Sequence, residues 1–200
     1  MGPEPLVLAS GSATRAAMLR AAGLSFEVEV PRVDEEALKA ALLAEERPAR
    51  DVADALAEMK AARVSGRRPG ALAIGSDQTL SCDGRLFSKP KTPEEAREQI
   101  GLLMGRTHRL HSAAVICRDG EPLWRHVSEA RLTMGRLSEA WLDGYVARNW
   151  ASIRHSVGGY RIEEEGVRLF ARIEGDHFTI LGMPLLPLLQ FLSARGSIPS

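Results

Sequence analysis

The chain of 200 residues has 44% apolar and 26% charged residues, so disordered and fibrous classes are excluded. Its 26 Lys and Arg residues balance 26 Asp and Glu residues, which leaves no overall positive field to hold a nucleic-acid backbone. The longest apolar stretch, residues 180–192, is interrupted by glycine, proline and glutamine and is too short to span a bilayer. We therefore expect neither a nucleic-acid partner nor a membrane partner.

The N-terminal residues and the cysteines indicate the compartment. No basic region followed by a long apolar segment is present at the N-terminus, so a secretory signal is not expected. Cys82 and Cys117 lie far apart in the sequence and form no CxxC motif, which favours two buried free thiols over a disulfide. We therefore predict that the protein is located in a reducing compartment, the cytoplasm.

The first half of the chain alternates short apolar runs with helical patterns. A strand is expected at residues 6–9 and a helix at 13–22, separated by the turn Ser10-Gly11-Ser12. Further predicted elements are a strand at residues 26–30, helices at 33–44 and 49–64, and a second buried strand at 71–74 that ends at Gly75-Ser76-Asp77.

The second half adds hairpins to this pattern. Asp83-Gly84 and Asp119-Gly120 predict the turns of two hairpins, residues 79–88 and 107–133. Helices are expected at 92–104, 138–148 and 184–194, and a strand at 167–173. Strand–helix units combined with long hairpins indicate an α/β protein with a mixed sheet, and composition fixes no boundary between lobes.

The turn Ser10-Gly11-Ser12 is the first candidate for chemistry. A helix that begins after a buried strand presents unpaired N–H groups, which bind anions. Gly11 permits close approach of the backbone, Ser10 and Ser12 add hydroxyl groups, and Arg15 suits paired hydrogen bonds to a phosphate. Taken alone, the same residues are more simply explained as a capped structural turn with a solvated arginine.

Three further segments carry charges suited to phosphate and metal chemistry. Asp77 follows an apolar strand, where a carboxylate can bind Mg²⁺ or accept a proton from water, although turns also favour Asp. Asp34 and Glu35 precede a helix, where negative charge is also simply stabilising. Lys89 could neutralise a phosphate or be an ordinary surface lysine. Together these groups form the set needed to cleave a phosphoanhydride with a divalent metal.

The motifs occur in an order that resembles the Maf-like nucleoside triphosphate pyrophosphatases over nearly the whole chain. The segments that carry the resemblance are Leu8-Ala9-Ser10-Gly11-Ser12-Ala13-Thr14-Arg15, Val33-Asp34-Glu35, Ile74-Gly75-Ser76-Asp77-Gln78, Ser88-Lys89-Pro90, Gly105-Arg106-Thr107-His108, Gly159-Tyr160, Ile173-Glu174-Gly175-Asp176 and Leu181-Gly182-Met183-Pro184-Leu185.

The resemblance implies a single Maf-like domain over residues 1–200, with a two-lobed Maf/ITPase-like α/β fold. An extended mixed sheet flanked by helices would carry a central cleft, and the protein would be a homodimer. The implied reaction hydrolyses a nucleoside triphosphate between the α and β phosphates with Mg²⁺ or Mn²⁺, releasing a monophosphate and pyrophosphate. An alternative from another class is a nucleotide-binding regulator of cell division with little or no turnover.

Residue roles are also implied by the resemblance. Asp77 would activate water directly or through the metal, and Glu35 would help to hold the metal. Arg15 and Lys89 would grip phosphates, and the Ser10-Gly11-Ser12 turn would contact the substrate.

Three positions bear on the base, and these are Thr14, Gln78 and Glu163. Gln78 with Glu163 is similar to the branch that prefers 7-methyl-GTP, and a carboxylate would suit a methylated, positively charged guanine. Thr14 departs from both known patterns, and the branch that prefers dTTP and UTP remains the alternative.

Overall fold

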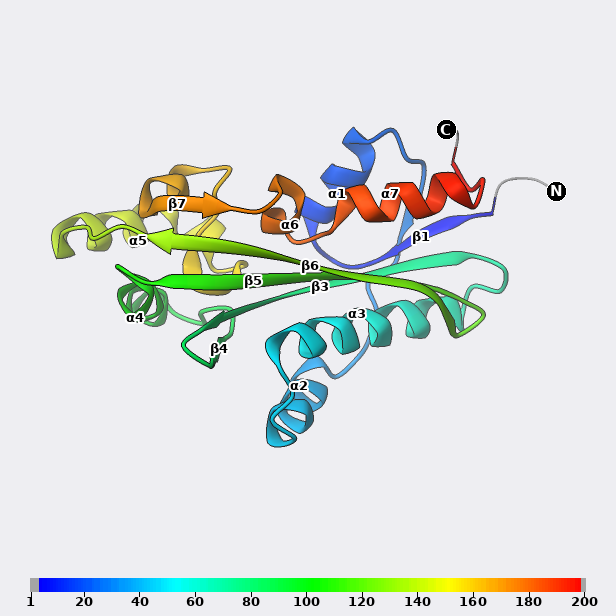
Figure 1. The fold of residues 1–200 in the computed structure, drawn as a ribbon, viewed down its shortest axis with the longest axis horizontal. Coiled ribbons are helices and arrows are strands. Elements are labelled where there is room, and N and C mark those ends of the chain that lie inside the picture. The colour runs from blue at the N-terminus through cyan, green and yellow to red at the C-terminus, as the bar shows by residue number, and fades with distance from the viewer. Residues whose placement is uncertain (1–3, 199–200) are drawn as a thin grey trace. The chain divides into compact units, whose positions relative to one another are not determined.

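The computed structural model describes residues 4–198 and has a mixed α/β architecture. Within that range, seven strands form a sheet in the order β2-β1-β3-β5-β6-β7, with β4 paired to β3 (Figure 1). The strand β1 is parallel to β2 and β3, whereas β3 and β6 are antiparallel to β4 and β7. The predicted mixed sheet flanked by helices is confirmed.

Two compact units make up the chain. The first comprises residues 1–78, 111–128 and 182–200, and the second comprises residues 79–110 and 129–181. Three long strands contribute residues to both units, and they are β3 (Leu72–Cys82), β5 (Thr107–Arg118) and β6 (Glu121–Met134).

The first unit contains the N-terminal strand–helix elements and the C-terminal helix. Its remaining elements are β1 (Leu6–Ala9), α1 (Ala13–Ala21), β2 (Glu27–Val28), α2 (Glu35–Ala44), α3 (Ala49–Ser65) and α7 (Leu185–Ala194). In Figure 1, α3 lies on one side of the sheet in this unit, and α1 and α7 lie on the other.

Small residues let α3 approach β3 very closely. Ala53, Ala57 and Ala61 on α3 are fully buried against β5. A Cβ atom at Gly75 on β3 would lie 2.1 Å from the Ala57 carbonyl oxygen. Only glycine fits at this position, because a side chain would push the helix away from the strand. The close packing fixes which residues of α3 reach β3.

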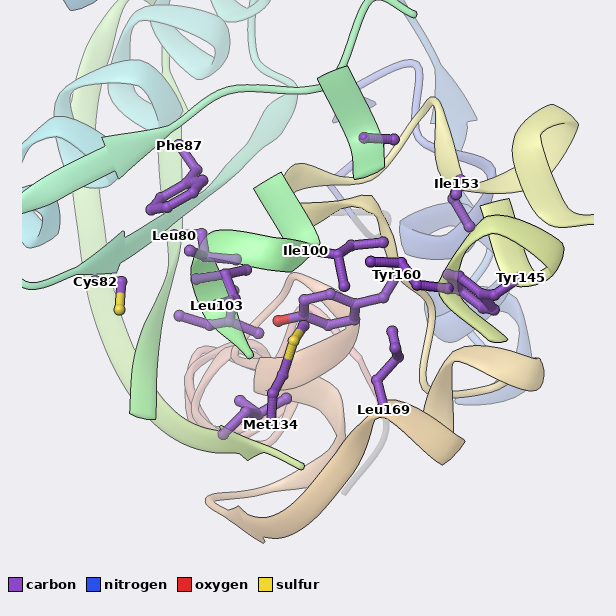
Figure 2. Packing of buried hydrophobic residues seen from close by; sticks show 14 of the residues in the cluster. Leu80, Cys82, Phe87, Ile100, Leu103, Met134, Tyr145, Ile153, Tyr160 and Leu169 are labelled. Carbon is purple, nitrogen blue, oxygen red and sulfur yellow. The ribbon is translucent and has the colours of Figure 1, made fainter. Parts of the chain in front are cut away.

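The second unit has an aromatic and aliphatic core. Its remaining elements are β4 (Arg85–Phe87), α4 (Pro93–Leu103), α5 (Glu139–Ile153), β7 (Phe170–Glu174), α6 (His177–Leu181) and two short 3₁₀ turns at Val157–Gly159 and Glu165–Leu169. Figure 2 shows the Tyr160 ring in the middle of this core, near Ile100, Met134 and Leu169. The Tyr160 hydroxyl pairs with Nε2 of buried His108 at 2.7 Å.

Four boundaries differ from the sequence predictions. The strand expected at residues 26–30 is only Glu27–Val28, because only these two residues pair with β1, opposite Val7 and Leu8. The strand expected at 167–173 starts at Phe170, since Gly166 lies against the Arg161 backbone in a compact 3₁₀ turn.

The other two differences are extensions of predicted elements. The helix α5 runs to Ile153 rather than to residue 148, because Ile153 continues its buried face. The strand β3 does not end at Gly75-Ser76-Asp77 but continues to Cys82, where β4 pairs with it.

Cys82 and Cys117 are both buried and free, as predicted. Among the described residues, no helix combines the length and apolar character required to cross a membrane.

Candidate active site

The turn after β1 holds Arg15 against the neighbouring strand. Ser12 caps α1 by accepting a hydrogen bond from the Arg15 backbone N–H at 3.3 Å. The Ser10 hydroxyl accepts from the Ser12 N–H at 3.2 Å and from Arg15 Nη1 at 3.3 Å. Because the pairing of β1 with β3 ends at Gly75, the next carbonyl, that of Ser76, accepts from Arg15 Nη1 at 2.9 Å. The parallel pairing of β1 with β3 thus joins the turn to the Asp77 segment.

Gly182 provides the third anchor for Arg15. Its carbonyl oxygen accepts from Arg15 Nε at 2.9 Å and from the buried Ser76 hydroxyl at 3.1 Å. Gly182 has φ +108°, a conformation that other residues rarely adopt. Arg15 Nη2 makes no hydrogen bond with any residue from 4 to 198. Protein oxygen atoms therefore hold Nε and Nη1, whereas Nη2 has no protein partner within this range.

Asp77 and Gln78 lie inside β3, so their side chains point to opposite faces of the sheet. The sequence prediction that Asp77 ends its strand was wrong, because the Gly75 turn signal instead reflects the close approach of α3. Asp77 shares its face with Gly75 and therefore points toward α3, whereas Gln78 points toward the other face.

A buried lysine on α3 holds Asp77. Lys60 Nζ donates to Asp77 Oδ2 at 2.6 Å and lies 2.9 Å from Glu35 Oε2. The Lys60 side chain is only 8% exposed and that of Asp77 13%, whereas Glu35 is 47% exposed. Buried charges of this kind are tolerated when they are paired, and Lys60 is paired twice. The structure thus brings Glu35 and Asp77 together through Lys60.

Glu35 begins α2 at the side of a surface depression. Asp34 caps this helix by accepting a hydrogen bond from the Ala37 N–H at 2.9 Å. Asp34 therefore stabilises the start of α2, which was the structural alternative for this acidic residue. The depression has a volume of about 600 Å³, is lined by residues 32–36 and makes Glu35 accessible to a ligand.

Arg15 interacts electrostatically with this pair of carboxylates. Burial lowers the pKa of Arg15, and the charges of Asp77 and Glu35 raise it. Arginine is not deprotonated in proteins, so Arg15 stays cationic. The cluster therefore contains two cations, Arg15 and Lys60, and two carboxylates.

Gln78 and Thr14 complete the candidate residues of the first unit. Gln78 Nε2 donates to the hydroxyl of buried Ser112 on β5 at 3.0 Å, which fixes the orientation of the amide. Thr14 is the second residue of α1 and is partly exposed.

Lys89 and Glu163 belong to the second unit. Lys89 is exposed in the connection between β4 and α4. Glu163 forms an ion pair with Arg161 at 3.1 Å, and this pair offsets its charge.

Sequence reasoning missed Lys60, Ser76, Ser112 and Gly182 as parts of the site. Lys60 alone left a clear signal. It lies one turn after Leu56 and one turn before Val64, on the apolar face of the helix. A lysine there requires a buried partner, and its spacing could have identified it.

Comparison with known proteins identifies the family. The model of the family described as "Maf-like protein" matches residues 5–195. The chain belongs to the Maf family. A nucleoside triphosphate pyrophosphatase of Ruegeria pomeroyi is 60% identical, with 97% of this chain and 98% of the relative covered.

Two other relatives have names that bear on substrate. A nucleoside triphosphate pyrophosphatase of Caulobacter vibrioides is 52% identical, covering 99% of each chain. A 7-methyl-GTP pyrophosphatase of Mesorhizobium japonicum is 51% identical, covering 98% of each chain.

Proposed function

We propose that this protein hydrolyses a nucleoside triphosphate to the nucleoside monophosphate and pyrophosphate. The observation that carries the proposal is one continuous set of contacts along β3. The Ser76 carbonyl anchors Arg15, and the next residue, Asp77, is held by Lys60 beside Glu35. Arg15, which can bind an anion, and Asp77, which can activate water, are therefore held by adjacent residues of β3. The activity named for the relatives supports the same reaction.

Asp77 is the residue assigned to water activation. A carboxylate accepts a proton from attacking water when it is held in a fixed orientation, and such catalysis contributes about 10²–10⁴-fold to the rate. Lys60 Nζ and the Gln78 N–H each donate to one Asp77 oxygen, at 2.6 Å in both cases. These two direct hydrogen bonds, one to each oxygen atom, hold the Asp77 carboxylate in one orientation.

Arg15 is assigned to phosphate binding through its Nη2 atom. Nε and Nη1 are fixed by protein oxygens, so Nη2 would donate to a phosphate oxygen with little loss of side-chain entropy. Ser10, Gly11 and Ser12 present the start of α1 to the same anion. Lys89 is assigned to phosphate neutralisation on the family resemblance.

The side chains present fit a Mg²⁺ or Mn²⁺ ion that shares its coordination with the substrate. Glu35 and Asp77 offer two carboxylates, and residues 4–198 contain no cluster of three acidic, histidine or cysteine side chains that would hold a metal ion. Mg²⁺ is commonly bound by one or two carboxylates together with waters and substrate phosphates. When bound, the ion would stabilise the charge that develops on the phosphates.

For the base, we propose a preference for 7-methyl-GTP over dTTP and UTP. The name of the Mesorhizobium relative and the pair of Gln78 with Glu163 support it. The preference should be modest, because Arg161 offsets the charge of Glu163.

We also propose a cytoplasmic homodimer on the family resemblance, and sedimentation of the purified protein tests the dimer.

The test is release of pyrophosphate from a panel of 7-methyl-GTP, GTP, dTTP and UTP with Mg²⁺. We expect one pyrophosphate for each monophosphate, and Asp77→Asn should lower kcat by at least about 100-fold. Circular dichroism of the variant controls for folding. Nucleotide binding without release, or full activity in a folded Asp77→Asn variant, would instead favour the regulator of cell division.

A further inference from the structure

Lys60 lies between the two carboxylates, Glu35 and Asp77, that would help to hold a metal ion. Its Nζ atom lies 2.6 Å from Asp77 Oδ2 and 2.9 Å from Glu35 Oε2. Lys60 reaches this position from α3, whose distance from β3 is fixed by the packing of Gly75 against Ala57. An ammonium group and a divalent cation compete for the same oxygen atoms, so the two cannot both bridge this pair.

The charges around the pair also disfavour a free cation. Arg15 interacts electrostatically with both Asp77 and Glu35, so two cations already balance two carboxylates. A free divalent ion therefore meets a cluster without net negative charge and must displace a buried ammonium group. A nucleoside triphosphate that carries its own Mg²⁺ is still an anion, and its phosphate oxygens offer Lys60 and Arg15 new partners.

We propose that Lys60 is a positioning residue that keeps free divalent cations from the Glu35–Asp77 pair and admits the metal only as its nucleotide complex. The proposal rests on the proposed function. On arrival of the triphosphate, the Lys60 ammonium group exchanges its contact with Glu35 for one with a phosphate oxygen and keeps its hydrogen bond to Asp77. Glu35 would then be available to help hold the metal that the nucleotide brings.

Direct binding of Mn²⁺ to nucleotide-free protein tests the proposal, with free Mn²⁺ measured by electron paramagnetic resonance. Lys60→Met removes the ammonium group, and Arg63→Met is the matched control because it removes an exposed cation one turn further along α3. We expect weak binding by the wild-type protein and by Arg63→Met. Lys60→Met should bind Mn²⁺ at least about tenfold more tightly, because it leaves two adjacent carboxylates without their cation.

Two results would overturn the proposal. One is tight, stoichiometric Mn²⁺ binding by the nucleotide-free wild-type protein, and the other is a folded Lys60→Met variant whose Mn²⁺ affinity is unchanged. Adding Asp77→Asn to Lys60→Met should abolish the gain, which locates the bound ion at this pair.

A second measurement decides the matter if Lys60→Met does not fold. Wild-type protein is titrated with Mn²⁺ with and without a triphosphate analogue that has a methylene group between the α and β phosphorus atoms. We expect protein-bound Mn²⁺ only with the analogue, and equal binding in both titrations contradicts the proposal. Pyrophosphate release is measured separately, so failure of the proposed function is distinguished from failure of the Lys60 assignment.

Discussion

The two units of the chain bury polar side chains in different surroundings. In the first unit, Lys60 and Asp77 are charged and pair with each other beside Glu35 and Arg15. In the second unit, His108 and Tyr160 share a hydrogen bond inside an apolar core that also contains Phe170.

The pKa values of the buried groups follow from this difference. Burial lowers the pKa of His108 to about 4, and it raises the pKa of Tyr160 well above its usual value. Both groups are therefore neutral at physiological pH. Polar groups in the second core serve stability, whereas those around Asp77 retain charge and can act on an anionic ligand. Variants of the charged groups around Asp77 should alter activity, and variants of the buried His108–Tyr160 pair should alter stability alone.

Gly75→Ala should produce the largest effect and should change both properties. Its Cβ would lie 2.1 Å from the Ala57 carbonyl oxygen and 2.7 Å from the Ala61 N–H nitrogen. Overpacking of a rigid core costs about 1–3 kcal/mol or more, and it would move Lys60 away from Asp77. Chemical denaturation and pyrophosphate release measure the two effects. Gly101→Ala controls for the loss of a glycine, because its Cβ would meet no atom within 4 Å and its backbone is not in the left-handed region. Unchanged activity in Gly75→Ala would show that the spacing of α3 does not set the site.

The second largest effect should be a loss of stability at low pH, caused by protonation of His108. The pKa of His108 is about 4 in the folded protein and about 6.5 when unfolded, so the unfolded chain binds the proton first as the pH falls. Stability is therefore full above pH ~6.5 and is lost as the pH falls toward ~4, by up to roughly 3 kcal/mol. Urea denaturation across this range measures the loss. A His108→Leu variant should show a flatter profile, and an unchanged profile would assign the loss to other groups.

Tyr160→Phe should destabilise the second unit by about 1–3 kcal/mol, because it removes the partner of buried His108 Nε2. Nδ1 of the same ring already lacks a partner among residues 4–198, so the ring would have none. Urea denaturation measures the change. The double variant His108→Leu, Tyr160→Phe should recover part of the loss, since it leaves no unpaired polar group. A large change in kcat with unchanged stability would contradict the division between the two units.

Ser112→Ala should have the smallest effect on stability, about 0.5–1.5 kcal/mol, and should act on base selection. The Ser112 hydroxyl accepts from the amide of Gln78, so Ser112→Ala removes one hydrogen bond that orients this amide. We expect kcat/KM for 7-methyl-GTP and for dTTP to become more nearly equal. Steady-state kinetics on both nucleotides measure this ratio. A folded variant with an unchanged ratio would remove Gln78 from base selection.

The sequence predicted the elements that depend on local signals. Ser12, Thr92 and Ser138 cap their helices, and Asp83-Gly84 and Asp119-Gly120 turn their hairpins, because each of these depends on neighbouring backbone atoms. The strand–turn–helix pattern also placed Arg15 and Asp77 after separate strands, and the structure adds the parallel pairing of β1 with β3 that joins their segments.

The sequence did not predict features that depend on distant packing. Gly75 has the composition of a turn but serves the close approach of α3, a constraint that appears only when Ala57 and Ala61 are in place. Lys60 meets its partners Glu35 and Asp77 from another element of the fold. The catalytic, metal-binding and substrate-binding roles of all the predicted site residues stay predictions, those of Lys89 and Glu163 included.

The identity of the products tests the central claim most directly. Purified wild-type protein is incubated with 7-methyl-GTP and Mg²⁺, and pyrophosphate, orthophosphate and the monophosphate are quantified together. The proposed pyrophosphatase activity predicts equal amounts of monophosphate and pyrophosphate with no orthophosphate, and the same ratio for every nucleotide that is hydrolysed. Release of orthophosphate, or bound nucleotide without any product across the panel, would contradict the account.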